Sequence, residues 1–474
     1  MAELEGYLST VGHPGVNEDH WNGTQQVQQI QQFQPPQELV QVEEVDTLSS
    51  AIREISLGVN GHFIGGTSTV TLGILLDSVI KGQDASGRTS RRDSEGSEEM
   101  RVDFSAAESP SSTALAEMMG PMFVSDNTSK RLFDGYLKNI ATRFPVLHTP
   151  RIKELHEHRE IINNSFDQAI LHLVYAISGR FLELSGQSDD NFYSDQHCEA
   201  AVAHMNEILG FGDMRSVVYL ILLGVYSIRA AKDLGAWTYV GLAMRLCVDV
   251  GIHRRIKIQK PSLRSEMDKR IFWSCYYLDR EISVAMGRPP ALSDNDIDAN
   301  LPFDIDEAAD DEETILRAST NISDKPCNPP TSLTSFIHQL RLKKIESEIQ
   351  HLVYRVDTPF DASQPLIQEL YDRLLAWEQS CPDEARGPVQ DLDNKPVDSI
   401  DVYVSSLSVK LGAIADISPK YIHYYRACRL LLYPTLTCSP VNKHYVSLCA
   451  EACGNLCESY KVGRNSQLLT TTKS

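Results

Sequence analysis

The chain has 474 residues, of which 42% are hydrophobic and 23% are charged, so it can bury the core of one large domain or two ordinary ones. Its formal net charge is -20 and its sequence pI is about 5.1. A surface this acidic repels a phosphate backbone, which argues against nucleic-acid binding by the bulk of the chain.

The N-terminal part is expected to lack a packed core. Residues 1–47 show no periodicity and contain a glutamine-rich tract, which predicts disorder and serves either as an activation segment or as a linker. Residues 48–80 form a Gly-rich lead-in segment. Its cluster Gly65-Gly66-Thr67-Ser68 lacks the lysine that a phosphate-binding loop needs where Thr67 stands, so we exclude a nucleotide site there.

Residues 81–117 form a charged, Ser-rich linker that is also predicted to be disordered. Within it, two arginines at positions 91 and 92 precede Ser94 in the pattern of a basophilic kinase site. Ser94 is therefore a candidate phosphosite, although a plain solvated linker is the simpler interpretation.

From residue 118 to residue 460 the helical period dominates, so we predict an all-α fold, an irregular multi-helix array, followed by a tail at 461–474. The longest apolar run, Val217 to Ile228, is too short to span a bilayer and is predicted to be a buried core helix. The clearest helices are predicted at Ser165–Leu184, Gln196–Leu209, Met214–Asp233, Trp237–Val250, Ser335–Tyr354, Ser363–Trp377 and Ile422–Pro434.

All ten cysteines lie at or after Cys198, without the close, even spacing of a disulfide framework, so a reducing compartment is expected. Cys449, Cys453 and Cys457 follow one another at helical steps, but no fourth zinc ligand stands nearby, and we interpret them as small core residues. The helix of Trp237 is expected to bury one stripe, with Gly241 admitting a neighbouring helix closely and Gly251 capping the end. That stripe comprises Trp237, Val240, Met244 and Cys247.

The stretch from Lys269 to Pro302 is the most informative one in the sequence. It predicts an amphipathic helix that ends at Gly287, because a left-handed glycine cap is followed by two prolines. Asp279 lies beside the apolar stripe, where a carboxylate is costly unless a partner satisfies it. The stripe itself is formed by Ile271, Cys275, Leu278, Ile282 and Ala285.

Two charged motifs flank this helix. A basic run from His253 to Arg270 is either a nuclear-import or phosphate-contacting patch or the ordinary cation cluster that follows a helix C-terminus. Asp294, Asp296 and Asp298 imitate the opening of a calcium loop, but the glycine and glutamate that such a loop needs further on are absent. We therefore predict no metal site there.

These motifs, in their order along the chain, resemble the signature of the fungal-specific transcription factor domain, the middle homology region of the fungal binuclear zinc cluster regulators. An earlier helix resembles the Ala-Trp…Gly-x-Ala-x-Arg…Gly-Leu-His-Arg segment of the same family. The matching site residues are Trp237, Gly241, Arg245, Gly251, His253, Arg254, Arg270, Trp273, Asp279, Arg280, Gly287, Arg288, Pro289, Asp296, Asp298 and Pro302.

The resemblance implies structural and regulatory roles for these residues. We predict that Arg245 or Arg288 is the partner of the Asp279 carboxylate. No nucleophile elbow, metal triad or phosphate loop is found, so no catalytic residue is predicted and the chain is not expected to be an enzyme.

The resemblance also implies a nuclear transcriptional regulator that is specific to a secondary-metabolism or catabolic pathway. The family's DNA reader holds two zinc ions with six cysteines, whereas the first 197 residues here contain none, so no cofactor is expected in this chain. DNA would then be a partner only indirectly or through a further N-terminal module. Other expected partners are the transcription machinery or other regulators, with a second copy of the chain and a small-molecule effector as further options, and no membrane.

The missing zinc cluster leaves alternatives open. The chain is either the body of a conventional DNA-binding regulator or a co-regulator or scaffold that acts only through protein partners.

Overall fold

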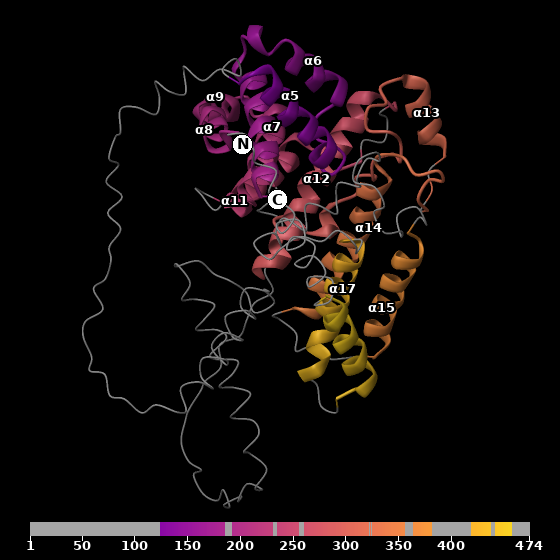
Figure 1. Ribbon diagram of the computed structural model, residues 1–474. Helices are drawn as coiled ribbons and strands as arrows, with labels where there is room; N and C mark the ends of the chain where they lie inside the picture. Colours follow the sequence, from indigo (N-terminus) through magenta and orange to yellow (C-terminus); the bar gives the residue numbers. More distant parts are fainter. Residues whose placement is uncertain are drawn as a thin grey trace, which may run out of the picture. The chain divides into compact units, whose positions relative to one another are not determined.

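The computed structural model describes residues 124–184, 192–230, 235–255, 260–321, 323, 325–355, 364–381, 419–437 and 441–456. These residues are helices joined by loops, with no strand in any of the described ranges, which confirms the predicted all-α irregular array (Figure 1). The segments 1–47, 48–80 and 81–117, with Ser94, lie outside the described residues, as does the tail 461–474.

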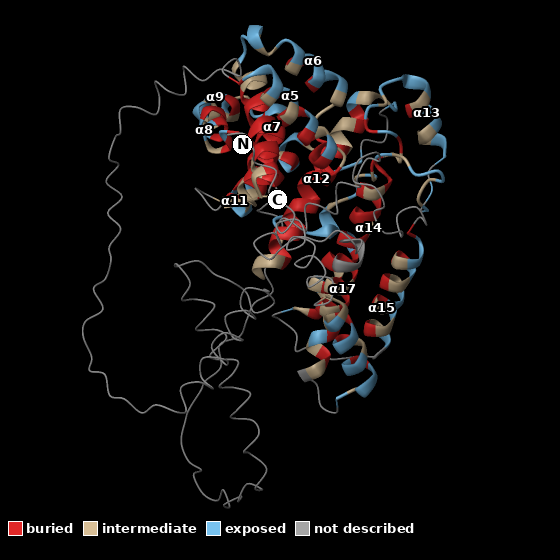
Figure 2. Cartoon of the chain, viewed as in Figure 1, coloured by how far each residue is buried: buried red, intermediate tan, exposed pale blue. Residues whose placement is uncertain are grey.

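The first part of the array is a set of helices packed around α7 and α10. Helix α7 is buried on almost every side and appears almost wholly red in the burial view (Figure 2), and almost every residue of α10 is buried as well. The helices of this part are α5 (Asp126–Tyr136), α6 (Thr149–Glu157), α7 (Ser165–Leu184), α8 (Ser194–Ala203), α9 (Met205–Gly210), α10 (Met214–Ser227) and α11 (Gly235–Val250).

Helix α12 (Leu263–Met286) is the longest described helix, and its ends are specified by local sequence. Ser262 and Ser265 form a reciprocal capping box at its start, which satisfies two of the free backbone N–H groups there. Gly287 ends it in the left-handed conformation with φ 65°, as the sequence predicts.

The remaining helices are α13 (Glu312–Thr320), α14 (Thr334–Val353), α15 (Gln364–Gln379) and α17 (Pro419–Leu432), and residues 443–456 are also helical. Trp377 of α15 stacks on His338 of α14 with ring centroids 4.3 Å apart, and its Nε1 donates to the His338 carbonyl at 2.7 Å. Cys449 is buried beside these helices, in agreement with its predicted role as a small core residue.

Two hydrophobic cores result, and two helices belong to both. The first core is built by α5–α12 and the start of α14, whereas the second is built by α14, α15, α17 and residues 443–456. Along α12 the change falls between Ile282 and Val284, and along α14 it falls between Leu340 and Leu342. Helices α12 and α14 therefore join the two cores.

The predicted helices agree closely with the observed ones, with three differences. The helix expected at Gln196–Leu209 is divided at His204 into α8 and α9, and the helix expected to reach Asp233 ends at Ser227. None of the helices in the described ranges is long and apolar enough to cross a membrane.

The third difference concerns α11. Trp237 was expected to be buried, but its side chain is 42% exposed because it lies at the edge of the buried face on the first turn. A Cβ added at Gly241 would meet only Arg245 of the same helix, so Gly241 does not admit a neighbouring helix. The close approach occurs instead at Gly224 of α10, where an added Cβ would lie 2.7 Å from Val240.

Candidate regulatory site on α12

The segment that follows α12 turns back and runs along that helix in the opposite direction. We call residues 291–307 the strap. Its contacts begin near the C-terminal end of α12 and move toward the N-terminal end as the strap proceeds. The pairs, in strap order, are Ala291 with Asp279, Leu292 with Arg280, Asp294 with Tyr276, Asn300 with Trp273 and Phe303 with Glu266.

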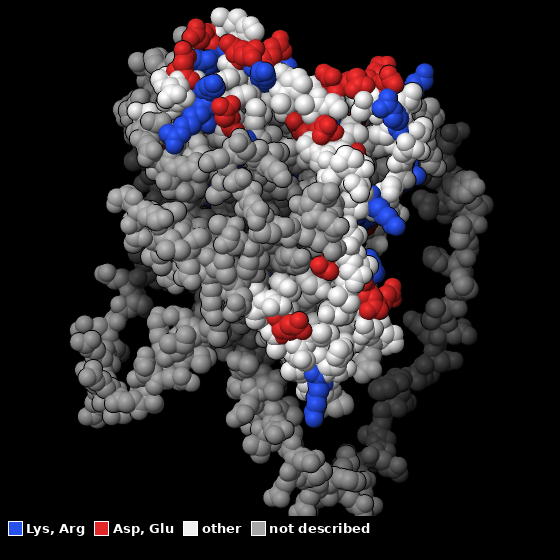
Figure 3. Space-filling view, turned by 45° about the vertical axis from the view of Figure 1, so that its right-hand side comes forward, with Lys and Arg blue, Asp and Glu red and all other residues white. Residues whose placement is uncertain are grey.

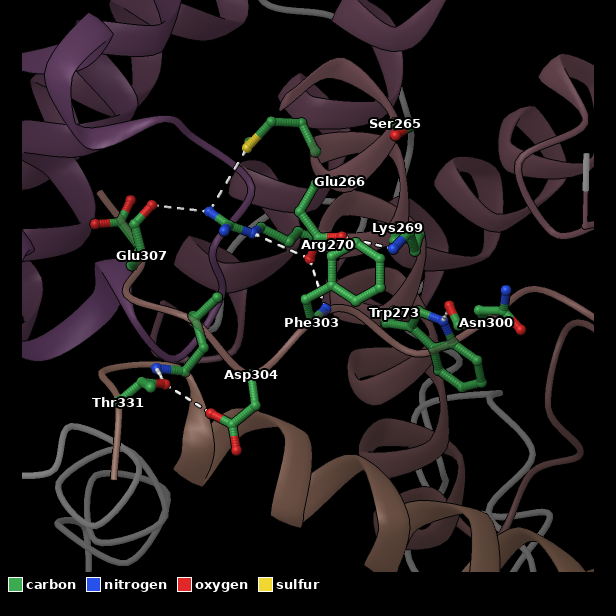
Figure 4. Close-up of polar contacts among 12 residues, drawn as sticks. Ser265, Glu266, Lys269, Arg270, Trp273, Asn300, Phe303, Asp304, Glu307 and Thr331 are labelled. Atoms are coloured by element: carbon green, nitrogen blue, oxygen red, sulfur yellow. Dashed lines mark hydrogen bonds and ion pairs between the residues drawn. The ribbon is translucent and has the colours of Figure 1, made fainter. Parts of the chain in front are cut away.

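Glu266 anchors the strap at the first turns of α12 (Figure 4). Its carboxylate is fully buried and accepts a 2.7 Å hydrogen bond from the backbone N–H of Phe303 and a 2.6 Å ion pair from Lys269. The Lys269 ammonium also lies 3.4 Å from the centre of the Phe303 ring. One buried acid thus fixes both a backbone donor and a neighbouring cation.

Arg270 and Trp273 hold the strap through its carbonyl oxygens (Figure 4). Arg270 Nη1 donates to the Glu307 carbonyl at 2.8 Å, and Trp273 Nε1 donates to the Asn300 carbonyl at 2.8 Å. Burial lowers the pKa of Arg270, while Glu266 and Glu307 oppose that change. Both side chains of α12 therefore serve as donors to the main chain of the strap.

Arg280 is the main polar contact in the C-terminal half of α12. Its guanidinium is fully buried and donates to Asp279 at 2.6 Å, to Ser347 of α14 at 2.9 Å and to the Leu292 carbonyl at 2.7 Å. It also lies 4.2 Å from the centre of the Tyr276 ring. This one side chain connects α12, the strap and α14.

The strap gives the Asp279 carboxylate a hydrogen-bond donor in addition to Arg280. Its carboxylate accepts the backbone N–H of Ala291 at 3.1 and 3.2 Å. Burial raises the pKa of Asp279 even though Arg280 and the Ala291 N–H favour the charged form. The strap therefore supplies a donor without which this carboxylate would be poorly compensated.

A set of buried charges lies where the two cores meet. We call Glu281 of α12, Lys343 and Glu346 of α14 and Arg426 of α17 the ion layer. Lys343 contacts both glutamates through Nζ, and Arg426 Nη1 lies 2.7 Å from Glu281. Three of the four side chains are at least nine-tenths buried, and Lys343 is fully so. These residues tie three helices together by charge.

The pKa values show how strongly these charges act on one another. Burial alone would raise the pKa of Glu281, but Arg426 and Lys343 hold it well below its usual range. Burial alone would lower the pKa of Lys343, but Glu281 and Glu346 raise it. Beside them, burial and then the charge of Lys343 depress the pKa of His423, whose ring nitrogens make no hydrogen bond with a described residue.

A second anchor of the strap lies beyond α11. The carbonyl of His253 accepts the backbone N–H groups of Asp298 and Ala299 at 3.3 and 3.2 Å. In return, the Asp298 carboxylate accepts the Arg255 backbone N–H at 2.7 Å and Arg254 Nε at 2.9 Å. These bonds lower the pKa of Asp298. The loop that follows α11 and the strap that follows α12 are thus hydrogen-bonded to each other.

A cavity of about 230 Å³ opens beside this second anchor. Its walls come from the loop after α11, the first turns of α12, the strap and the end of α13. It is lined by Ile252, Arg254, Arg255, Pro261, Ser265, Asp268, Lys269, Ala299, Asn300, Phe303 and Ser319.

Comparison with known proteins agrees with this architecture. The family model described as fungal specific transcription factor domain matches residues 134–379, which include α12, the strap and α14. That match covers more than half of the chain. The chain belongs to this family.

The curated relatives are regulators from fungi. The positive regulator of purine utilization of Emericella nidulans is 22% identical over 458 residues, covering 76% of this chain and 42% of that protein. The transcriptional activator protein acu-15 of Neurospora crassa is 28% identical, covering 58% of this chain and 29% of that protein. This chain spans less than half the length of either relative. No solved structure matches it.

Within the family signature, the structure contradicts the predicted partner of Asp279. Arg245 is exposed on α11 and donates to the Gly241 carbonyl of its own helix, while the Arg288 guanidinium lies 4.6 Å from the centre of the Trp237 ring. The partner is Arg280, the next residue in the sequence. An adjacent arginine was overlooked because neighbours on a helix do not normally face each other.

The other signature residues are placed as follows. Gly251 ends α11 with φ 85°, as predicted, and Pro302 is buried in the strap. The Pro289 carbonyl lies 3.4 Å from the Ser283 hydroxyl, whereas Asp296 is exposed in a short 3₁₀ turn. Regulatory roles for these residues remain predictions.

The calcium-like aspartates diverge instead of converging. Asp294 accepts from the Tyr276 hydroxyl at 2.7 Å, and Asp298 binds the loop after α11. No group of three or more potential metal ligands gathers in the described parts of the chain.

The ion layer was missed by the sequence analysis. Lys343 and Glu346 stand among Leu342 and Ile345, at positions that the apolar pattern of α14 assigns to the core. A lysine and a glutamate one turn apart within such a face are the signal that could have indicated a buried pair. Arg426, more than a hundred residues from Glu281, gave no comparable signal.

Proposed function

We propose that this chain is the regulatory part of a nuclear, pathway-specific transcription factor, and that the α12 site couples its two cores. Family membership and the regulatory functions after which the relatives are named support this proposal. The observation that carries the proposal is the set of contacts that α12 makes with other parts of the chain. Its buried polar side chains bind the strap, α14 and α17, so the helix acts as a structural connection between cores, and we assign it no catalytic role.

The acidic surface bears on how such a regulator would reach its genes. Acidic side chains run along the upper edge of the face in Figure 3, with basic ones scattered among them, and the net charge is -20. Because this charge opposes phosphate binding, DNA would be reached through a further module or a protein partner. A co-regulator or scaffold without its own DNA reader is therefore the second candidate.

A reporter assay separates these functions. The full chain, fused to a foreign DNA-binding domain, should raise or lower transcription of a reporter, and Glu281→Gln should change that output at equal protein level. A fluorescent fusion should accumulate in the nucleus. A fusion that is nuclear and stable but leaves the reporter unchanged would favour the scaffold.

The pathway is tested in the source fungus. Deletion of the gene should change transcripts of one contiguous or metabolically linked gene set, either catabolic or secondary-metabolic. A diffuse response across unrelated genes would contradict the pathway-specific part of the proposal.

A further inference from the structure

The cavity beside the second anchor is lined by more cations than acids, although Arg254 is paired with Asp298 and Lys269 with Glu266. Three of its lining side chains are cations, Arg254, Arg255 and Lys269, against the single carboxylate of Asp268. These cations belong to the basic run from His253 to Arg270, for which the sequence leaves a nuclear-import or phosphate-contacting patch and an ordinary cation cluster as alternatives. The structure places Arg254, Arg255 and Lys269 of this run on the wall of a concave site.

The two arginines are held in place yet keep donors available. Arg254 uses Nε on Asp298, and Arg255 uses Nη2 on the Asn300 side chain at 2.6 Å. A guanidinium carries five N–H groups, so each arginine retains several that no described residue engages. Since the Arg254 side chain is 58% exposed, these donors are reachable from solvent. Two guanidinium groups held in place in this way are well suited to bind the carboxylate of a ligand.

Asp268 adds an acceptor to the same cavity. Its carboxylate makes no hydrogen bond with another described residue, and burial raises its pKa although Arg264 opposes this. A half-buried carboxylate of this kind gains from a ligand that brings a hydroxyl or amino donor. It also repels a ligand that offers only negative charge.

The apolar lining residues and the volume of the cavity restrict the kind and the size of ligand that it can bind. Ile252, Pro261, Ala299 and Phe303 give the cavity an apolar surface, which favours a carbon skeleton over a bare inorganic anion. A volume of about 230 Å³ leaves room for a small organic molecule such as a four-carbon acid.

We propose that this cavity binds a small organic acid, with its carboxylate on Arg254 and Arg255, its carbon skeleton against Phe303 and a hydroxyl or amino group donating to Asp268. Binding itself is independent of the function proposed above. A regulatory meaning for it, as an effector site beside the strap, rests on that function.

The test uses three acids with the same four-carbon skeleton, succinate, L-malate and L-aspartate, which differ only in the hydrogen, hydroxyl or amino group at one carbon. Isothermal titration calorimetry on the full chain at low salt should show L-malate and L-aspartate binding more tightly than succinate. Arg255→Gln should weaken all three by about tenfold, the loss of about one charge-assisted hydrogen bond. Asp268→Asn should weaken L-aspartate most and strengthen succinate.

The controls make every outcome decisive. Arg151→Gln removes a comparably exposed arginine of α6 that does not line the cavity, and it should leave all affinities unchanged. Sulfate serves as the bare anion. The proposal is overturned if none of the three acids binds, if sulfate binds as tightly as L-malate, or if Arg255→Gln and Asp268→Asn bind like the wild type while retaining its melting temperature.

The same variants separate this site from the proposed function. If the acids bind but the reporter fusion is silent, the cavity stands and the transcriptional role fails. If the fusion is active and no acid binds, the reverse holds.

Discussion

The strap and the ion layer both satisfy polar groups of α12, but they do so with different chemistry. The strap contributes mainly backbone donors and acceptors, such as the Phe303 N–H and the Asn300 carbonyl, and its partners lie 12 to 37 residues away in the sequence. The ion layer contributes side-chain charges from helices 62 and 145 residues away. We call the strap together with the α12 side chains that contact it the strap zone. The strap zone is local in sequence and hydrogen-bonded, whereas the ion layer is long-range in sequence and ionic.

This difference predicts different responses to mutation. Removing one side chain of the strap zone leaves a main-chain group that can reorient toward water, so the loss should stay near the value of a hydrogen bond. Removing one member of the ion layer leaves a partner charge buried without compensation, which costs far more. The two zones should therefore differ in the free energy of unfolding that a single truncation removes.

The largest expected effect comes from Glu281→Ala. Lys343 is fully buried and Arg426 largely so, and both would lose the same carboxylate, so we expect a loss of about 3 to 5 kcal/mol of stability. Chemical denaturation monitored by circular dichroism measures it. The matched control is Glu313→Ala, which breaks an exposed pair with Arg317 and should cost less than about 0.5 kcal/mol. Equal losses of stability in the two variants would contradict the idea that a buried charge of the ion layer costs more to leave unpaired than an exposed one.

A buried histidine outside both zones gives the next largest effect. Burial lowers the pKa of His197 in α8 to about 4, whereas an unfolded histidine titrates near 6.5. Between these values His197 binds a proton in the unfolded chain but not in the folded one. The free energy of unfolding that depends on His197 is therefore fully present above pH 6.5 and is lost as the pH drops toward 4. His197 alone should account for a loss of about 3 kcal/mol over this window.

The measurement is the free energy of unfolding against pH for the wild type and His197→Phe. The variant should lack this part of the acid slope. Since the pKa of His423 is also lowered, part of the slope should remain in His197→Phe and diminish further in the double variant with His423→Phe. Identical slopes in the wild type and the double variant would contradict the assignment.

The same contrast explains what could be predicted from the sequence. Helical periodicity predicted α7, α11 and α14 to within two residues at each end, and the glycine cap predicted the C-terminal end of α12 but not its start at Leu263, because local patterns determine these features. The need of Asp279 for a partner was also predictable, since a carboxylate beside an apolar stripe is costly. Its observed partners were not predicted, because Arg280 is a sequence neighbour on the same helix and the Ala291 N–H reaches Asp279 only when the strap folds back. In the same way, Arg426 reaches Glu281 only through the packing of α17.

A smaller effect is expected in the strap zone. Trp273→Phe keeps an aromatic ring in the first core but removes the Nε1 donor to the Asn300 carbonyl, so we expect a loss of about 1 to 2 kcal/mol from the hydrogen bond and the smaller ring. Denaturation under the conditions used for Glu281→Ala allows direct comparison. A loss as large as that of Glu281→Ala would remove the distinction between the two zones.

The smallest effect tests the corrected partner of Asp279. In a double-mutant cycle, Arg245→Ala and Asp279→Ala should be additive, with a coupling energy below about 0.5 kcal/mol, because Arg245 is exposed and bonded to its own helix. The matched cycle of Asp279→Ala with Arg280→Ala should show a coupling energy several times larger, since those side chains lie 2.6 Å apart without access to water. Unfolding free energies of the six proteins decide the comparison. A large coupling to Arg245 would mean that the Arg245 side chain turns from its own helix toward Asp279 in solution, and that the charge compensating Asp279 comes from α11 and not from Arg280.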